Sequence, residues 1–239
     1  MTVLSEATIV LLNRYAETHD YLAAAHSFLK EMLKPYAGDS YLTYRYEHSL
    51  RVMRRGLQIA EGEGWDAEPL MIACLLHDVG YPECHTPEEF SRHQEVSAQI
   101  AAFFLDRIGY DRDVSKAICR GIFLHNLWDD VPGDASPFEL SVRDADDLDR
   151  FDALRTCMKG NAITGNAFIC DRSAAEVIEG CRTQLEKIEA DSRHLCATVT
   201  ARNLWNDQLR ERRAYYEILL RHMNATLEAE RLLAGIDGK

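Results

Sequence analysis

Glycine and proline are scarce in this chain of 239 residues, which contains 13 glycines and 6 prolines. Tight hairpins depend on Asn-Gly or Asp-Gly pairs between alternating apolar and polar runs. The sequence has no such pair, and its one Asp-Gly, Asp237-Gly238, lies at the tail. Because turn and strand signals are so few, a β-sheet is not expected. Helices are therefore the expected structure throughout the chain.

Basic residues are also few. The chain has 27 lysines and arginines but 39 aspartates and glutamates, so its net charge is −12. A protein that grips nucleic acid needs a basic excess, so we expect no nucleic-acid partner. A small phosphorylated substrate needs only a local basic patch and stays compatible with this charge. No apolar run approaches the roughly 18 residues of a membrane helix, so we expect no membrane partner either.

The cysteines show no disulfide or metal-binding framework. They are odd in number, scattered and never spaced as Cys-x-x-Cys: Cys74, Cys84, Cys119, Cys157, Cys170, Cys181 and Cys196. The N-terminal residues carry no basic stretch ahead of an apolar run and no small-residue cleavage site, so they do not resemble a secretory signal. We therefore expect free thiols and a cytoplasmic location.

Apolar periodicity predicts an all-α fold. The expected helices lie at about 5–34, 41–63, 66–78, 87–108, 111–126 and 139–159, with two or three more in the last seventy residues. A loop is expected at 129–137 and a break at 160–166. The helix at 66–78 is apolar on every side, which is typical of a buried helix. We expect one domain over 1–239, with a core of about 41–160 and a C-terminal helical extension of about 167–239.

His77 and Asp78 end the apolar helix in the sequence CLLHDVG. An imidazole and a carboxylate at the end of a buried helix need a compensating partner, and a divalent metal is one such partner. Consecutive helical residues point about 100° apart, so both side chains reach one ion only at a helix terminus. The alternative interpretation is a histidine near the negative end of the helix dipole, with the aspartate turning into the loop.

Four more His and Asp residues lie on apolar faces of other helices. His48 shares a stripe with Val52 and Ile59, His93 with Val96 and Ile100, His125 with Ile118 and Ile122, and Asp146 with Val142. Taken singly, each histidine is also explained as a satisfied core residue, and Asp146 as part of a solvated acidic run. Together with His77 and Asp78 they form a set that a helical bundle can gather around a metal or a metal pair.

This order of residues resembles that of the HD superfamily of metal-dependent phosphohydrolases. The resemblance covers about residues 41–151, and three motifs carry it: His-x-x-Arg-Val at His48–Val52, His-Asp-Val-Gly at His77–Gly80, and Ala-Asp-x-Leu at Ala145–Leu148. It implies an HD-domain helical bundle with additional C-terminal helices. It also implies a divalent metal bound by four ligands, which are His48, His77, Asp78 and Asp146.

Further histidines between the His-Asp pair and the last aspartate mark the family members that hold two metals. His93 and His125 occupy those positions. The resemblance implies that they bind a second ion, with Asp78 bridging both ions as the catalytic residue. Imidazole and carboxylate ligands suit Mn, Fe, Co, Ni or Zn. We therefore expect one or two divalent transition-metal ions as the cofactor.

The resemblance further implies an enzyme, a phosphohydrolase that uses metal-activated water on a nucleotide or another small phosphate ester. Arg51 and Arg55, three and seven residues after His48, point to about the same side of the helix and are expected to bind the substrate. Further cations that can contribute are Lys116, Arg120 and Arg143. The general base stays open between Asp149 and Glu83. Some branches of the family carry an acid three places after the motif aspartate, where this chain has Tyr81.

Two other functions compete with phosphate hydrolysis. Some binuclear HD-fold proteins with the same ligand order hold a mixed-valent di-iron centre and use O₂ to cleave C–C or C–P bonds. A non-catalytic helical protein that keeps the metal site for folding or ligand sensing is the second alternative. The C-terminal helices are expected to pack on the bundle, to cover the site or to form a homodimer.

Overall fold

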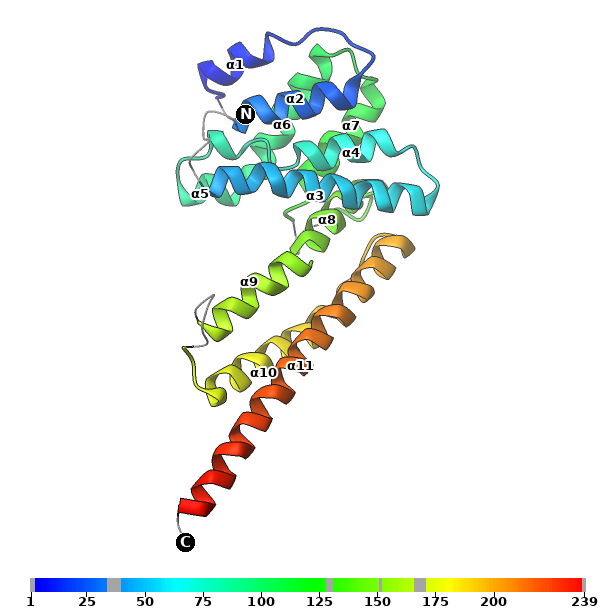
Figure 1. Ribbon diagram of the computed structural model, residues 1–239. Helices are drawn as coiled ribbons and strands as arrows, with labels where there is room; N and C mark the ends of the chain where they lie inside the picture. The colour runs from blue at the N-terminus through cyan, green and yellow to red at the C-terminus, as the bar shows by residue number, and fades with distance from the viewer. Residues whose placement is uncertain (1–2, 34–39, 128–130, 151, 166–170, 238–239) are drawn as a thin grey trace. The chain divides into compact units, whose positions relative to one another are not determined.

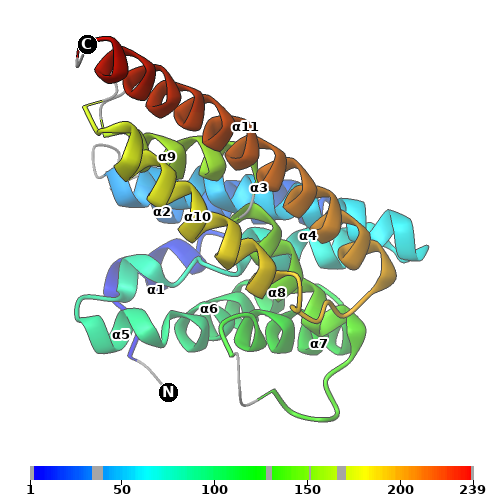
Figure 2. The same cartoon turned by 90° about the horizontal axis from the view of Figure 1, so that it is seen from below.

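The computed structural model describes residues 3–33, 40–127, 131–150, 152–165 and 171–237. These residues form helices joined by loops, with no β-strand among them, which confirms the predicted all-α fold (Figures 1 and 2). Contacts divide the chain into two compact units. The first comprises Met1–Asp149 and Cys196–Ala201, and the second comprises Arg150–Leu195 and Arg202–Lys239.

The first unit contains the helices from the N-terminus to α8. In chain order they are α1 (Glu6–Leu12), α2 (Tyr21–Leu33), α3 (Ser40–Glu63), α4 (Ala67–Leu76), the short 3-10 helix η2 (Tyr81–Glu83), α5 (Pro87–Ser91), α6 (His93–Arg107), α7 (Arg112–Leu124) and α8 (Pro137–Arg150). Helices α6 and α7 lie side by side, as Figure 2 shows.

Helix α4 is the centre of the first unit. It packs against α2, α3 and α7, and Leu70, Ile72 and Leu76 on it are fully buried. A Cβ added at Gly56 of α3 would lie 2.7 Å from Sγ of Cys74, so the glycine lets α3 and α4 approach closely. The buried helix predicted from the apolar run is confirmed. Because α4 ends in the interior, the residues that follow it also lie there.

The N-terminal segment forms two helices instead of the single helix expected at about 5–34, so this prediction was wrong. Residues 13–20 separate α1 from α2. Within this segment the ring of Tyr15 packs edge-on against Phe28 and Phe104, with centroid distances of 5.4 and 5.3 Å. Tertiary packing of the aromatic ring overrides the local helical pattern here.

Two further expected helices are also divided. Arg92 splits the helix expected at about 87–108 into α5 and α6, since its φ of −119° and ψ of 19° lie outside the helical region. The helix expected at about 139–159 is split into α8 and α9, where the side chain of Asp152 accepts a hydrogen bond from the N–H of Arg155 and caps α9. Neither break contains a glycine or proline, so the sequence pattern did not indicate them.

The second unit contains α9 (Ala153–Thr164), α10 (Ala174–Asp191) and most of α11 (Val199–Asp237). Helix α10 packs against α9 and lies along α11 in both views (Figures 1 and 2). The break expected at 160–166 does not begin at Gly160, because α9 continues to Thr164. A side chain at Gly160 would collide with the hydroxyl of Tyr215, so the glycine permits close packing of α9 on α11. Residues 166–170 lie outside the described residues.

The boundary between the units, after Asp149, precedes the expected limit of the core at about residue 160. The difference arises because α9 packs against α10 and therefore belongs with the C-terminal helices. The expectation of a single domain stays a prediction. The loop expected at 129–137 is present at 131–136, with residues 128–130 outside the described part.

None of the described helices is long and apolar enough to cross a membrane. The described cysteines are free thiols. Cys170, which was expected to be free as well, lies outside the described residues.

Candidate metal centre

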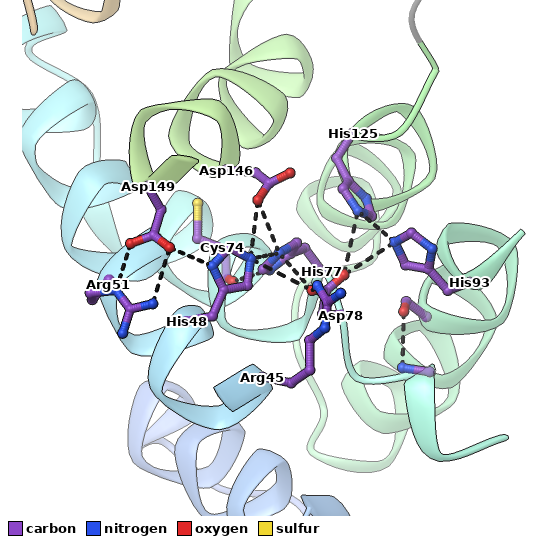
Figure 3. Close-up of polar contacts among 12 residues, drawn as sticks. Arg45, His48, Arg51, Cys74, His77, Asp78, His93, His125, Asp146 and Asp149 are labelled. Carbon is purple, nitrogen blue, oxygen red and sulfur yellow. Dashed lines mark hydrogen bonds and ion pairs between the residues drawn. The ribbon is translucent and has the colours of Figure 1, made fainter. Parts of the chain in front are cut away.

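Buried histidine and aspartate side chains converge in the first unit (Figure 3). They come from several helices: His48 lies in α3, His77 and Asp78 follow α4, His93 is the first residue of α6, His125 follows α7, and Asp146 lies in α8. All are at most 5% exposed. The structure thus brings together every residue that the sequence indicated as a metal ligand.

His48, His77 and Asp146 form a first donor group. Nε2 of His48 lies 3.3 Å from Nε2 of His77 and 3.1 Å from Oδ1 of Asp146. Nε2 of His77 lies 3.9 Å from the same carboxylate oxygen. The neighbouring Asp144 does not take part in this group, and one of its oxygens accepts a hydrogen bond of 2.6 Å from the N–H of Ala197.

His93, His125 and Asp78 form a second donor group. Nε2 of His93 lies 3.1 Å from Nε2 of His125 and 3.2 Å from Oδ1 of Asp78. Nε2 of His125 lies 3.6 Å from the same oxygen. This group has the same composition as the first, two imidazoles and one carboxylate oxygen.

The carboxylate of Asp78 lies between the two donor groups. Its Oδ1 faces His93 and His125, as described above, whereas its Oδ2 lies 3.3 Å from Nε2 of His77 and 3.6 Å from Nε2 of His48. One oxygen is thus directed at each pair of histidines. A carboxylate in this orientation is suited to bridge two cations, as carboxylates do in dinuclear helical bundles.

The second ring nitrogen of each imidazole is held by a hydrogen bond. Nδ1 of three histidines donates to the backbone oxygen three residues earlier: His77 to Cys74 at 2.8 Å, His93 to Phe90 at 2.8 Å and His125 to Ile122 at 2.6 Å. Nδ1 of His48 lies 2.7 Å from Oδ2 of Asp149. Because carbonyl and carboxylate oxygens only accept, the Nδ1 atoms carry the protons. The Nε2 atoms therefore present their lone pairs to the centre.

This donor set fits divalent metal ions. Two imidazole lone pairs that face each other at 3.1 Å, as those of His93 and His125 do, repel unless a cation lies between them. When they are ionised, the carboxylates of Asp78 and Asp146 likewise only accept and cannot donate a hydrogen bond. Neutral imidazole and carboxylate are the ligands that Mn, Fe, Co, Ni and Zn favour in proteins. The number and identity of the ions stay predictions.

The electrostatics of the centre also favour bound positive charge. Burial raises the pKa of the Asp78 carboxyl, but the surrounding imidazoles, first of all His77, hold this pKa well below its usual range. Burial lowers the pKa of His48, yet its hydrogen bonds to Asp146 and Asp149 outweigh this effect and raise the pKa to about 9. Without an ion, Nε2 of His48 therefore holds a proton, whose charge takes the place of a metal ion and which must leave before this nitrogen can offer its lone pair.

The turn after the His-Asp pair fixes the pair against α6. His77 caps α4 with φ −57° and ψ −34°, and the N–H of Gly80 donates to Oγ of Ser97 at 2.9 Å. A Cβ at Gly80 would lie only 2.6 Å from the backbone nitrogen of Ser97, so a side chain does not fit at this position. The glycine therefore lets the turn contact α6, the helix that carries His93.

The arginines expected to bind substrate contact other side chains. Nε of Arg51 donates to Oδ1 of Asp149 at 2.6 Å, so Arg51 supports the partner of His48. Nη1 of Arg55 donates to Oε1 of Gln58 at 3.0 Å. A role of these two arginines in substrate binding stays a prediction.

Arg45 contacts the centre itself, although it was not singled out from the sequence. Its Nη1 lies 2.7 Å from Oδ2 of Asp78, and its guanidinium lies 4.0 Å from the ring centroid of Tyr81. Arg45 precedes His48 by three residues and therefore lies on the same face of α3. Arg51, three residues after His48, was expected to bind substrate because of this spacing. The same spacing could therefore have indicated Arg45.

Two of the other cations expected to contribute form ion pairs on the surface. The exposed Lys116 pairs with Asp113, and Arg120 pairs with Asp134 on the surface. Arg143 is half-buried in α8.

The acids considered as general base are engaged as well. Asp149 contacts His48 and Arg51, and Glu83 accepts hydrogen bonds from Ser5 and Thr8.

Comparison with known proteins points to one family. Residues 45–154, which include all the convergent ligands, match the family model of the HD domain. The crystal structure of a predicted HD superfamily hydrolase from an uncultured Thermotogales bacterium resembles the chain with a TM-score of 0.51 and 19% sequence identity, over 92% of this chain and 97% of that chain. At 19% sequence identity, this similarity shows only that the two chains share a fold. No curated protein matches the chain. The family that the chain matches, over residues 45–154, is thus that of the HD domain.

Proposed function

We propose that the chain is a metal-dependent hydrolase that uses water to cleave a small phosphate ester, such as a nucleotide. The observation that carries this proposal is the position of Asp78, whose two carboxylate oxygens face the two donor groups. Divalent transition-metal ions held by these residues would supply a water nucleophile at neutral pH and would neutralise charge on the phosphoryl oxygens. The match of residues 45–154 to the HD domain supports the same chemistry.

Arg45 is the residue that we assign to the phosphate of the substrate. Its side chain is 17% exposed and lies directly beside Asp78, so it can reach a molecule that enters the centre. A guanidinium matches the geometry of a phosphate with two parallel hydrogen bonds. Its contact with the face of Tyr81 keeps the guanidinium close to the centre. Arg45 thus binds and orients the phosphate next to the metal ligands.

The residues around the centre keep its donors oriented. Asp149 and three backbone carbonyls fix the imidazole rings through Nδ1. Because these bonds are made before any ion or substrate arrives, the Nε2 atoms need little reorganisation on binding. Burial of the ligands excludes bulk water and strengthens their interactions with charged groups.

A di-iron oxygenase that cleaves a C–C or C–P bond is the second candidate function. A carboxylate between two histidine pairs is equally suited to two irons, so the same observation supports both. The metal bound in the natural protein and its response to O₂ distinguish the two functions.

The test uses protein purified without added metal and then loaded with Mn or Co. We expect hydrolysis of p-nitrophenyl phosphates or of a member of a nucleotide panel, lost in His77→Ala and kept in the control His85→Ala, which replaces an exposed histidine. Metal-loaded protein that leaves every ester intact would contradict the proposal. Two irons per chain with a mixed-valence EPR signal would favour the oxygenase instead.

A further inference from the structure

The C-terminal part of α11 extends beyond α10, the helix that lies along it in the second unit. The two helices run in opposite directions (Figure 1), and Arg212 of α11 donates to Gln184 of α10 at 2.8 Å. Since α10 begins at Ala174, its start lies level with about residue 222 of α11. The remaining residues of α11, about 15 up to Asp237, continue past that end of α10.

One face of this part of α11 carries a regular row of exposed side chains, which we call the heptad seam. Its positions are spaced alternately by three and four residues, which is the spacing of a coiled-coil interface. The seam consists of Tyr215, Ile218, His222, Ala225, Ala229 and Leu232, and all six are exposed. The three large apolar members Tyr215, Ile218 and Leu232 are 40%, 45% and 66% exposed. A continuous exposed apolar stripe of this kind is typical of a protein–protein interface.

A different face of the same segment is apolar as well. Met223 and Leu227 follow the fully buried Tyr216 by about two and three turns on its face of the helix, and both are half-buried. A helix with apolar residues on more than one face is normally covered on each of them. A helical segment of about 15 residues is also only marginally stable in water without tertiary contacts. The heptad seam therefore needs a partner.

Two charged residues beside the heptad seam indicate what this partner is. Arg221 and Glu228 lie on the same edge of the seam, seven residues apart, and both are exposed. Within the described part of the chain neither forms an ion pair. When a second copy of α11 lies antiparallel, with its Ala225 beside His222, Arg221 of each copy lies opposite Glu228 of the other. Two-fold symmetry forms this ion pair twice.

A parallel pair of the same helices lacks this match. In parallel coiled coils a residue at the position of Arg221 faces the residue five places later in the partner, which here is the neutral Thr226. The charges beside the seam thus favour the antiparallel orientation.

The antiparallel register also matches the sizes of the seam residues. Ile218 of one copy faces Ala229 of the other, and His222 faces Ala225. A large side chain thus lies opposite a small one at these contacts, which lets the two helices approach closely. At each end of the seam Tyr215 faces Leu232, and these exposed apolar side chains cover each other.

We propose that α11 is a dimerisation helix, whose heptad seam packs antiparallel on the heptad seam of a second copy of the chain. The two-fold axis passes near residues 223 and 224. None of the metal ligands belongs to α11, so the dimer does not depend on the proposed hydrolase function.

Sedimentation equilibrium of the full chain at about 1–100 μM tests the proposal. We expect a reversible equilibrium between monomer and dimer. Ile218→Glu and Leu232→Glu should each raise the Kd of the dimer by at least about tenfold, because each places a carboxylate in an apolar contact. The control Val10→Glu, which replaces a side chain of α1 that is 55% exposed, should leave the Kd unchanged.

Two results of this measurement would overturn the proposal. A wild-type chain that stays monomeric at about 100 μM would leave the heptad seam to a different protein or to a membrane. A dimer whose Kd is the same in wild type, Ile218→Glu and Leu232→Glu would be formed by another surface.

Charge reversal tests the antiparallel register. Arg221→Glu and Glu228→Arg each place like charges opposite each other at both symmetry-related contacts, so each should raise the Kd by about 5–20-fold. The double variant restores opposite charges and should return the Kd to within about threefold of wild type. Because the double variant contains both changes, a restored dimer also shows that neither change unfolds the helix. Single reversals without effect, or a double variant as weak as the singles, would overturn the proposal.

Discussion

Nδ1 of His48 lies 2.7 Å from Oδ2 of Asp149, and this hydrogen bond connects a metal ligand with a carboxylate outside the ligand set. Arg51 holds the same carboxylate through Nε at 2.6 Å and Nη2 at 3.2 Å. Burial raises the pKa of Asp149, but the contacts with His48 and Arg51 outweigh it and keep the pKa below its usual value. The ionised Asp149 therefore fixes the tautomer and the orientation of His48.

Asp149→Asn should weaken metal binding by about 10–100-fold, because the amide keeps an acceptor for Nδ1 but removes the negative charge. Competition with a chelator measures the affinity for Mn or Zn. Asp113→Asn is the matched control, since Asp113 is exposed and pairs only with a lysine of the surface in the contacts described. An unchanged affinity of Asp149→Asn would show that this carboxylate does not support the ligand.

Gly80→Ala should destabilise the protein by about 1–3 kcal/mol, because the added methyl group collides with the backbone nitrogen of Ser97. Urea denaturation measures the free energy of unfolding. Gly133→Ala serves as the control, since a Cβ there meets nothing within 4 Å, and it should change stability by less than about 0.5 kcal/mol. Equal stability of the two variants would mean that the turn tolerates a side chain.

Arg45→Met should raise the KM for a phosphate ester by about 10–100-fold, since it removes a charge-assisted contact to the phosphate. This prediction rests on the proposed hydrolase function. Steady-state kinetics separate KM from kcat, and Arg55→Met is the control because its partner is Gln58, outside the centre. A larger effect of Arg55→Met than of Arg45→Met would return the substrate contact to the arginines first expected from the sequence.

Glu83 should make stability depend on pH in the acidic range. Burial raises its pKa, but hydrogen bonds from Ser5 and Thr8 outweigh this and lower it below the usual value. A carboxyl with a lowered pKa in the folded state stabilises the protein above its unfolded pKa of about 4.3. This contribution is lost as the pH falls through the folded pKa.

The difference in Tm between wild type and Glu83→Gln should therefore be constant above about pH 5 and shrink as the pH falls below about 4. Melting curves measured from pH 7 to pH 3 check this. A difference that grows toward acid pH would contradict the sign of the shift.

Much of the fold followed from the sequence because apolar spacing determines helices and burial. The unbroken apolar run of α4 predicted a buried helix, and the structure has one. The break at Arg92 was missed because no residue of the segment SRHQ forbids a helix. The segment around Tyr15 was missed for a related reason, since its conformation depends on Phe28 and Phe104, which are distant in the sequence.

The sequence indicated the residues that could bind a metal. It did not indicate as well the residues that hydrogen-bond to these ligands. A His-Asp pair at the end of a buried helix and polar residues on apolar faces indicated His48, His77 and Asp78. Asp149 shares the stripe of Asp146, but its contact with the far ring nitrogen of His48 depends on the distance between α3 and α8. No spacing along the chain encodes such a distance, so Asp149 was considered only as a base.

Elemental analysis of the protein, purified without added metal, tests the bridging position of Asp78 most directly. Two ions per chain are expected in the wild type. One ion is expected in His93→Ala, since the second donor group loses a ligand while the first keeps His48, His77 and Asp146. A wild-type chain with one ion or none, or a His93→Ala variant that keeps two, would contradict a dinuclear centre around Asp78.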